Sequence, residues 1–214
     1  MSSNLTEKSF PASVQFPSGK KIRYKTIAED FTELNRFFFE YLTSFSIPVA
    51  FKEKFAENVL SMHEHLPYTF YLKVSNNLDT AAANTFGKNL WEPFPMPVIE
   101  YVHFGNGENI ISQNHIVSLD IALIEDLKYM NRACTKINAV MKSFFERRNF
   151  SLVSFGCFFG KSENKVVLCG DFAPPYLQVI QTPELSSVEQ NYFNFDDAAQ
   201  LKNYVNLLLN AIKS

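Results

Sequence analysis

The segment from Leu119 to Phe145 constrains the fold most, because large apolar residues recur along it at helical spacing. These residues alternate in steps of four and three, as in a helix that buries one face. They are Leu123, Leu127, Met130, Cys134, Ile137, Met141 and Phe144. Arg147 and Arg148 follow at the place where positive charge suits a helix C-terminus. We therefore predict that this segment forms the longest helix of the chain, with one buried face.

Other patterns predict further helices and a series of short strands. A capping box at Thr26 and Glu29 starts a helix whose apolar face reaches Leu42 and needs a sheet to cover. Segments rich in aromatic and β-branched residues predict strands at 49–55, 59–62, 68–74, 98–104, 152–159 and 165–171. Gly87 should end a short helix over 81–86, and a last amphipathic helix should cover 201–212. Residues 1–20 show no steady period, and we expect them to be loosely anchored.

The composition describes a folded globular protein and excludes several classes of partner. Its 214 residues are 46% hydrophobic and carry a formal net charge of -2, so neither nucleic acid nor a membrane surface is an expected partner. No segment reaches the ~20 apolar residues of a spanning helix, and residues 1–15 lack the features of a secretory signal. Three cysteines without a CxxC spacing indicate reduced thiols and a cytoplasmic protein. Since there are only seven glycines, loops that bind phosphate should be scarce.

Four short motifs allow a chemical interpretation, and each also has a purely structural one. Pro17-Ser-Gly-Lys-Lys21 lacks the second glycine of a phosphate loop and is expected to form a turn. His63-Glu64-His65 either begins a zinc site, if a third ligand comes from elsewhere, or forms a polar hairpin tip. Cys157 and Cys169 stand among phenylalanines, which favours buried thiols over a nucleophile. Asp171 either helps to hold a magnesium ion or caps a turn, and a single carboxylate is a weak metal site.

A series of motifs follows a recognisable order along residues 18 to 182. It begins with Ser18-Gly-Lys-Lys21, Phe39-Glu-Tyr-Leu42 and Ile47-Pro-Val-Ala-Phe-Lys-Glu53. It continues with Pro97-Val-Ile-Glu-Tyr101, Ile111-Ser-Gln-Asn-His-Ile116, Ile137-Asn138, Phe144-Phe145, Leu152-Val-Ser-Phe155, Phe159-Gly160 and Val167-Leu168. In this order the sequence resembles the SAICAR synthetase family, the ATP-dependent ligases of purine biosynthesis that join aspartate to a carboxylated aminoimidazole ribotide.

The resemblance implies an α+β fold with two lobes, antiparallel sheets and packed helices, and with ATP held between the lobes. We expect residues 1–66 to form the small lobe and residues 67–214 the larger α+β lobe. The family's glycine-rich hairpin, which reads GKAKxIY, has no counterpart before Ser18. The small lobe is therefore expected to be truncated.

The resemblance also implies that several charged positions of the family carry uncharged residues in this chain. An arginine that grips the ribotide aligns with Ser75, and a lysine and an acidic residue of one strand align with Gly156 and Phe158. A further lysine aligns with Phe104, and a later arginine aligns with Gln178. Phosphoryl transfer and ligation depend on charge compensation by cationic groups and metal ions. These replacements therefore predict that the reaction has been lost.

We accordingly expect a SAICAR synthetase-like protein that acts as a binding or regulatory protein, with a protein partner, a second copy or a nucleotide as its ligand. The remaining polar residues of its cleft are predicted to be Asn76, Glu100, His115 and Asp171, with Asp171 as the metal candidate and no catalytic residue. The alternative is an active ATP-dependent ligase, either SAICAR synthetase or an enzyme of altered substrate, which uses ATP and magnesium. An enzyme of altered substrate would rely on Asp171 and on His63, His65 and His103 as replacement groups.

Overall fold

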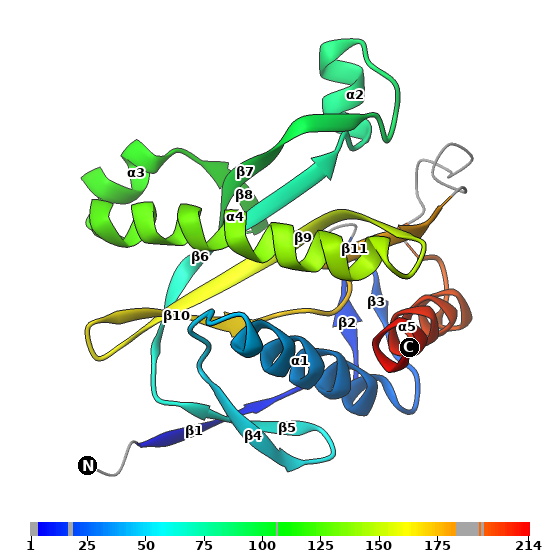
Figure 1. The fold of residues 1–214 in the computed structure, drawn as a ribbon, viewed down its shortest axis with the longest axis horizontal. Helices are drawn as coiled ribbons and strands as arrows, with labels where there is room; N and C mark the ends of the chain where they lie inside the picture. Colours follow the sequence, from blue (N-terminus) through cyan, green and yellow to red (C-terminus); the bar gives the residue numbers. More distant parts are fainter. Residues whose placement is uncertain (1–3, 17–18, 106, 183–192, 194) are drawn as a thin grey trace.

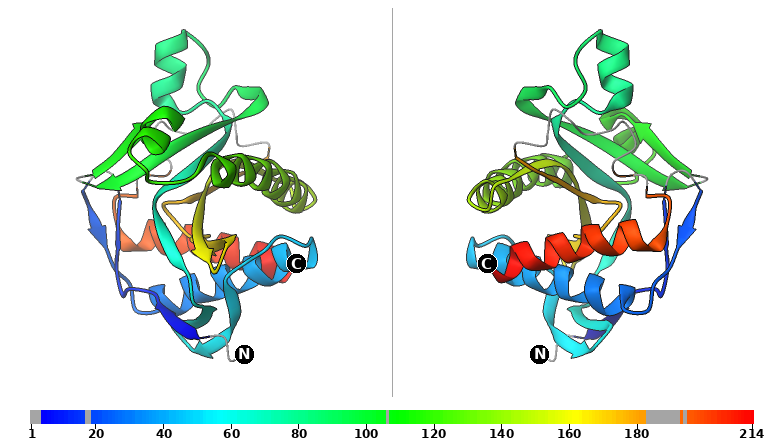
Figure 2. Two further views of the ribbon diagram at one scale, coloured as in Figure 1. Left: turned by 90° about the vertical axis from the view of Figure 1, so that its left-hand side faces the viewer. Right: turned by 90° about the vertical axis from the view of Figure 1, so that its right-hand side faces the viewer.

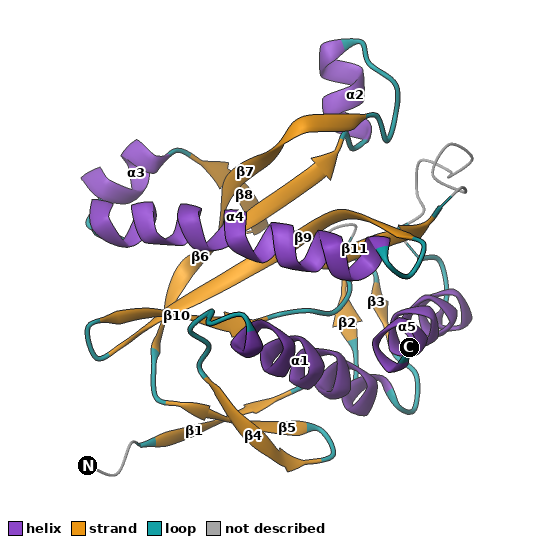
Figure 3. Cartoon of the chain, viewed as in Figure 1, coloured by secondary structure: helices purple, strands orange, loops and turns teal. Residues whose placement is uncertain are grey.

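The computed structural model describes residues 4–16, 19–105, 107–182, 193 and 195–214 as a mixture of helices and antiparallel strands (Figure 1; Figure 3). Its helices are α1 (Ile27–Ser44), α2 (Thr80–Phe86), α3 (Gln113–Ser118), α4 (Ile124–Glu146) and α5 (Ala198–Lys213). Its strands are β1 (Leu5–Ser9), β2 (Val14–Gln15), β3 (Lys21–Ile22), β4 (Phe51–Ala56), β5 (Val59–His63), β6 (Leu66–Asn77), β7 (Pro93–Gly105), β8 (Gly107–Ile111), β9 (Phe150–Ser162), β10 (Lys165–Gly170) and β11 (Leu177–Gln181). The expected α+β class with antiparallel sheets is confirmed.

The larger sheet has the strand order β10-β9-β6-β7-β8, and β11 also pairs with β9. Helix α4 lies across one face of this sheet and contacts β6, β7, β9 and β10 (Figure 1). Successive side chains of a strand point to opposite faces, so Leu72 and Val74 of β6 are buried in the core while Tyr71 and Lys73 lie on the other face. We call this second face, on the side away from α4, the cleft face.

A smaller sheet with the order β1-β5-β4 packs beneath α1, and α1 in turn packs against α5 (Figure 1). In the left view of Figure 2 the short β2–β3 hairpin lies on the side of the large sheet away from α4. The expectation of a loosely anchored N-terminus is wrong for β1, because this strand pairs with β5 over its whole length. Pro17 and Ser18 of the predicted turn lie outside the described residues, and Gly19 beside them has a φ of 82°.

The predicted long helix is confirmed as α4 but begins later than its apolar pattern. Helix α3 ends at Ser118, and a non-helical link with a φ of 52° at Asp120 separates it from α4. Leu119 and Leu123 belong to this link and are 69% and 61% exposed. The apolar spacing therefore extends before the start of α4, because two exposed leucines of the link follow the same spacing as the buried residues of the helix.

Helix α1 is also confirmed, whereas its predicted capping box is wrong. The Thr26 hydroxyl donates a hydrogen bond to the Asp30 carboxylate at 2.9 Å and makes no cap to the backbone. The short helix α2 ends at Gly87 with a φ of 61°, as predicted from the glycine. The strands predicted from aromatic and β-branched residues are all present, and their ends lie within five residues of the predicted ones.

The boundary predicted between residues 66 and 67 falls where the chain passes from one sheet to the other. The three-stranded sheet lies before it, and β6 of the large sheet begins at Leu66. The assignment of these two parts as separate lobes stays a prediction. In the part of the chain that the structure describes, no helix is long and apolar enough to cross a membrane.

Candidate functional site

A cavity of about 400 Å³ opens between β1 of the small sheet and the large sheet, and we call it the cleft. Side chains of β1 and β5 form one wall, and side chains of β6, β7, β9 and β10 form the other. Its lining includes Lys8, His65, Tyr68, Phe104, Phe158 and Cys169. The large-sheet wall of the cleft thus carries four Phe and Tyr rings, and its β1 side carries one ammonium group and the Glu7 carboxylate.

Four aromatic side chains on the cleft face pack into one group, which we call the aromatic cluster: Tyr71, Phe104, Phe158 and Tyr176. The rings of Tyr71 and Phe158 stack with centroids 4.7 Å apart, and Phe104 stacks on Phe158 at 5.8 Å. Tyr176 meets Phe158 edge-on at 4.8 Å. Offset and edge-on arrangements of this kind are the favourable ones for aromatic rings. The cluster therefore holds together without a ligand.

Pairing of the strands explains how these residues meet. Tyr71 of β6 lies directly opposite Phe158 of β9, and Lys73 lies opposite Gly156. Phe104 comes from the end of β7, and Tyr176 immediately precedes β11. The cluster joins four segments that are distant in sequence.

Carboxylates surround the two phenol groups of the cluster. The Tyr71 hydroxyl donates to the Glu108 carboxylate at 3.2 Å. Burial is the main cause that raises the pKa of Tyr71 and of Tyr176 well above the ordinary value, and nearby Glu108 adds to both shifts. Glu100 contributes to the shift of Tyr71, and Asp171 to that of Tyr176. Both tyrosines therefore stay neutral, and the surroundings of the cluster are acidic.

Gly156 leaves no room for a side chain at the centre of the cluster. A Cβ atom at this position would lie 2.9 Å from Cε2 of Phe158 and 3.3 Å from Cδ2 of Tyr71. Lysine, the residue of the family that the resemblance places here, therefore cannot occupy this position while Phe158 keeps its place.

We expect Gly156→Ala to lower the free energy of unfolding by about 1–3 kcal/mol, because the added methyl group overpacks the cluster. The measurement is urea unfolding followed by circular dichroism. Combining this change with Phe158→Leu should cost less than the sum of the two single changes, since leucine removes the colliding ring atom. Strict additivity of the two changes would contradict the contact.

The structure places Asp171 beside the cleft in a network with Asn35 of α1. The Asn35 amide donates to Oδ1 of Asp171 at 2.7 Å and to the carbonyl oxygen of Phe31, and its own oxygen accepts from the amide of Phe172 at 2.9 Å. Lys8 donates to the carbonyl oxygen of Cys169 at 2.9 Å. One oxygen of the candidate metal ligand is thus already held by an amide.

The other predicted cleft residues lie in three different places. Glu100 is half-buried on the cleft face of β7, near Tyr71. Asn76 is buried on the opposite side, where its amide and that of Asn138 in α4 exchange two hydrogen bonds of 2.9 Å. His115 is exposed in α3 and forms a capping box with Ser112. The structure therefore brings Glu100 and Asp171 to the aromatic cluster and does not bring Asn76 and His115 there.

The histidine motif lies in the link between the two sheets, and the cysteines lie in the core. The predicted hairpin tip at His63-Glu64-His65 is wrong, because β5 ends at His63 and the chain then crosses to the other sheet. Among the described residues, no group of three or more His, Cys, Asp or Glu side chains could hold a metal ion. The three cysteines are buried and free; burial raises the pKa of Cys169 to about 11 and that of Cys157 well above its usual range.

Comparison with known proteins assigns the chain to a family. The SAICAR synthetase family profile matches residues 17–176, about three quarters of the chain. The chain belongs to the SAICAR synthetase family. A phosphoribosylaminoimidazole-succinocarboxamide synthase from Persephonella marina is 24% identical over 179 residues, which cover 80% of this chain and 73% of that protein. The synthase from Chloroherpeton thalassium is 25% identical over 104 residues and matches 49% of this chain and 44% of its own length.

Solved structures of SAICAR synthetases share the fold at lower sequence identity. The enzyme from Ehrlichia chaffeensis superposes with a TM-score of 0.84 at 18% identity and covers 97% of this chain and 91% of that chain. The Type-1 structure from Pyrococcus horikoshii gives 0.84 at 18% identity and covers 98% and 95%. A SAICAR synthetase (Type-2) in complex with ADP gives 0.83 at 20% identity and covers 96% and 90%.

The sequence interpretation missed Tyr71, Tyr176, Glu108 and Asn35. Strand alternation puts Tyr71 and Lys73 on one face, and this signal was available in the pattern of β6. The contacts of Tyr176, Glu108 and Asn35 depend on segments far apart in the chain. No local pattern indicates them.

Proposed function

We propose that this protein keeps the fold of the SAICAR synthetase family, lacks its ATP-dependent ligation of aspartate, and acts as a cytoplasmic binding or regulatory protein. The observation that carries the proposal is the close approach of Phe158 to Gly156, together with the stacking of Phe104 on Phe158. By the resemblance, a lysine of the family aligns with Gly156, an acidic residue with Phe158 and a second lysine with Phe104. Stacked rings occupy the space that charged groups need for the reaction.

Charge in and around the cleft supports the same proposal. The phenols of the aromatic cluster stand among Glu108, Glu100 and Asp171, and these carboxylates repel a polyphosphate. Lys73, also on the cleft face, pairs with Asp79 at 3.1 Å, and Lys8 is bonded to a carbonyl oxygen. Two positions that carry arginine in the family read Ser75 and Gln178. Transition states of phosphoryl transfer need several cationic groups, and the charge of Lys73 is already balanced by a carboxylate.

The groups that could bind magnesium and ATP in the cleft also fit these ligands poorly. Magnesium takes carboxylate oxygens in near-octahedral geometry, usually together with substrate phosphates. Asp171 is the carboxylate that the resemblance retains, and its Oδ1 accepts a hydrogen bond from Asn35. Loss of nucleotide binding is therefore part of the proposal.

The test is calorimetric titration of the full chain with magnesium and ATP, together with an assay of ligation of aspartate to the carboxylated ribotide. We expect no saturable heat of binding up to about 1 mM nucleotide; a dissociation constant in that range corresponds to a binding free energy of only about 4 kcal/mol. We also expect the ligation assay to give no product. The Pyrococcus horikoshii enzyme, run in parallel, provides the positive control. Micromolar binding that Asp171→Asn abolishes, or product formed by the full chain, would establish the alternative of an active ligase.

A further inference from the structure

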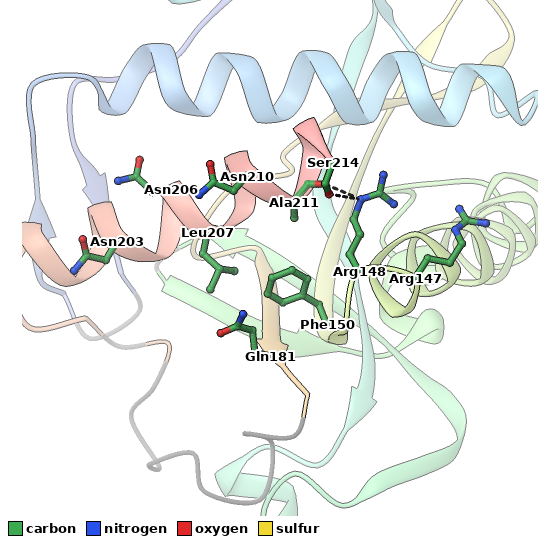
Figure 4. A pocket seen from close by; sticks show the side chains of 10 residues that line it. All are labelled: Arg147, Arg148, Phe150, Gln181, Asn203, Asn206, Leu207, Asn210, Ala211 and Ser214. Atoms are coloured by element: carbon green, nitrogen blue, oxygen red, sulfur yellow. Dashed lines mark hydrogen bonds between the residues drawn. The ribbon is translucent and has the colours of Figure 1, made fainter.

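A second and larger cavity, of about 830 Å³, lies outside the cleft along α5, and we call it the α5 groove (Figure 4). It is bounded by the C-terminal end of α4, the beginning of β9, the end of β11 and one face of α5. It shares no lining residue with the cleft. Its polar lining consists of Arg147, Arg148, Gln181, Asn203, Asn206, Asn210 and Ser214.

The carboxamide groups of the α5 groove have no hydrogen-bond partners within the described part of the chain. Asn203, Asn206 and Asn210 are exposed at helical spacing on α5, and Gln181 comes from β11 below them (Figure 4). Asparagine is a weaker helix former than lysine or glutamate, by a few tenths of a kcal/mol per residue, so three of them on one exposed helix face weaken that helix. A carboxamide offers one acceptor and two donor hydrogens, as a peptide group offers both functions. This face is therefore suited to pair with main-chain amides.

The lining of the α5 groove contains no acidic side chain, and its two arginines differ in what they bind. Arg148 is already used: its Nε donates to the carbonyl oxygen of Ala211 at 2.7 Å, and Nη1 donates to that of Phe144 at 3.1 Å. It thereby offsets the negative ends of α4 and α5. Arg147 is exposed and donates only to the Tyr41 hydroxyl, at 3.0 Å, among the described residues. Arg147 thus leaves a positive charge available to a ligand.

We propose that the α5 groove binds an extended acidic segment of a partner protein. The stretch of α5 from Asn203 to Ala211 rises about 12 Å, the length of about four residues of extended chain. Main-chain amides of the segment pair with the asparagine and glutamine side chains, and a carboxylate pairs with Arg147. Leu207, which Figure 4 shows pointing toward Phe150 and Gln181, offers a contact for one apolar side chain.

Two other ligand classes fit this lining less well. Sugars stack on exposed aromatic rings, and Phe150, the aromatic residue of the groove, is only 8% exposed. A polyphosphate needs several free cations, and Arg147 is the one cation among the described lining residues of the groove that is not held by main-chain oxygens, as Arg148 is. An acidic peptide requires one cation and many amide partners, which is the set that the groove provides.

The experiment uses the full chain and a fluorescein-labelled hexapeptide, acetyl-(Glu-Val)3-amide, followed by fluorescence anisotropy. Matched (Lys-Val)3 and (Gln-Val)3 peptides serve as controls of charge. We expect the acidic peptide to bind at least tenfold more tightly than the lysine peptide, and its binding to weaken between 50 and 300 mM salt. In spectra of 15N-labelled protein, the side-chain amide signals of Asn203, Asn206, Asn210 and Gln181 should shift on binding.

Three variants separate the α5 groove from general charge effects. Arg147→Glu and the double change Asn206→Ala with Asn210→Ala should each weaken binding at least fivefold. Arg132→Glu, the same charge change at an exposed position of α4 outside the groove, should leave it unchanged. All variants are first checked for an unchanged melting temperature.

The proposal is overturned if Arg147→Glu and Arg132→Glu have equal effects, or if the lysine peptide binds as well as the acidic one. It is also overturned if inorganic phosphate moves the amide signals and the acidic peptide does not, which would make the groove a site for small anions. Concentration-dependent sedimentation abolished by Arg147→Glu would assign the groove to a second copy of the chain instead. None of these outcomes depends on nucleotide binding in the cleft, so the proposal stands or falls separately from the proposed function.

Discussion

Replacing Phe38 with alanine is expected to lower the free energy of unfolding by about 3–5 kcal/mol, as deletion of a buried phenylalanine ring does. Phe38 is fully buried in α1, and its ring lies 5.5 Å from Phe172, 5.7 Å from Phe144 and 5.8 Å from Phe145. The ring thus joins α1 to α4 and to the loop after β10. Alanine leaves a cavity that three neighbouring rings border but cannot fill without leaving their own contacts.

Urea unfolding at neutral pH measures this loss, and Phe55→Ala provides the control. Phe55 is 66% exposed in β4, so its removal should change the unfolding free energy by no more than about 0.5 kcal/mol. Similar losses for the two variants would mean that the Phe38 ring does not link the two helices.

The change Asn76→Asp should destabilise the protein by about 3–5 kcal/mol at pH 7, although it alters almost no volume. The Asn76 amide nitrogen donates to Oδ1 of Asn138 at 2.9 Å and to the carbonyl oxygen of Leu152 at 3.1 Å. A carboxylate has no hydrogens to donate to these two acceptor oxygens. It would face them as a negative charge at a buried position, because Asn76 is only 7% exposed.

The loss should depend on pH in a defined direction. Burial raises the pKa of the introduced carboxyl group in the folded state above its unfolded value of about 3.9. A group with a raised folded pKa stabilises below its unfolded pKa and loses that contribution as the pH rises. The difference from the unchanged protein should therefore be smallest near pH 4, where the neutral carboxyl group still lacks one of the two donor hydrogens, and largest at pH 7 to 8.

Urea unfolding between pH 4 and pH 8 measures this difference. The exposed Asn89→Asp variant should differ little from the unchanged protein at any of these pH values. A loss for Asn76→Asp that is the same at pH 4 and pH 8 would show that the carboxyl group reaches solvent.

Periodicity predicted the main elements of this fold because one side of each is buried in a common core. The apolar stripe of α4 was readable for this reason, as were the aromatic strands of the large sheet. The link between α3 and α4 was not readable, since the exposed Leu119 and Leu123 follow the same spacing as the buried residues. An apolar period records which residues share a helix face, and it does not record where a helix begins.

The candidate site was predictable only in part. Strand alternation separates Ser75, on the cleft face, from Asn76, whose partner Asn138 lies in α4. The resemblance indicated which charged positions had become apolar, including Phe104 and Phe158. That these rings stack on each other depends on strand register across the sheet, which the sequence of one strand does not contain.

The close approach of Phe158 to Gly156 also bears on how these residues arose. A Cβ atom at position 156 would lie 2.9 Å from the Phe158 ring, so a lysine there and this ring position exclude each other. If an ancestor carried the family's lysine, its replacement by glycine relieved the contact with the phenylalanine at 158. Return of a side chain at 156 alone would carry at least the cost expected above for alanine. A single steric contact thus couples the histories of the two positions.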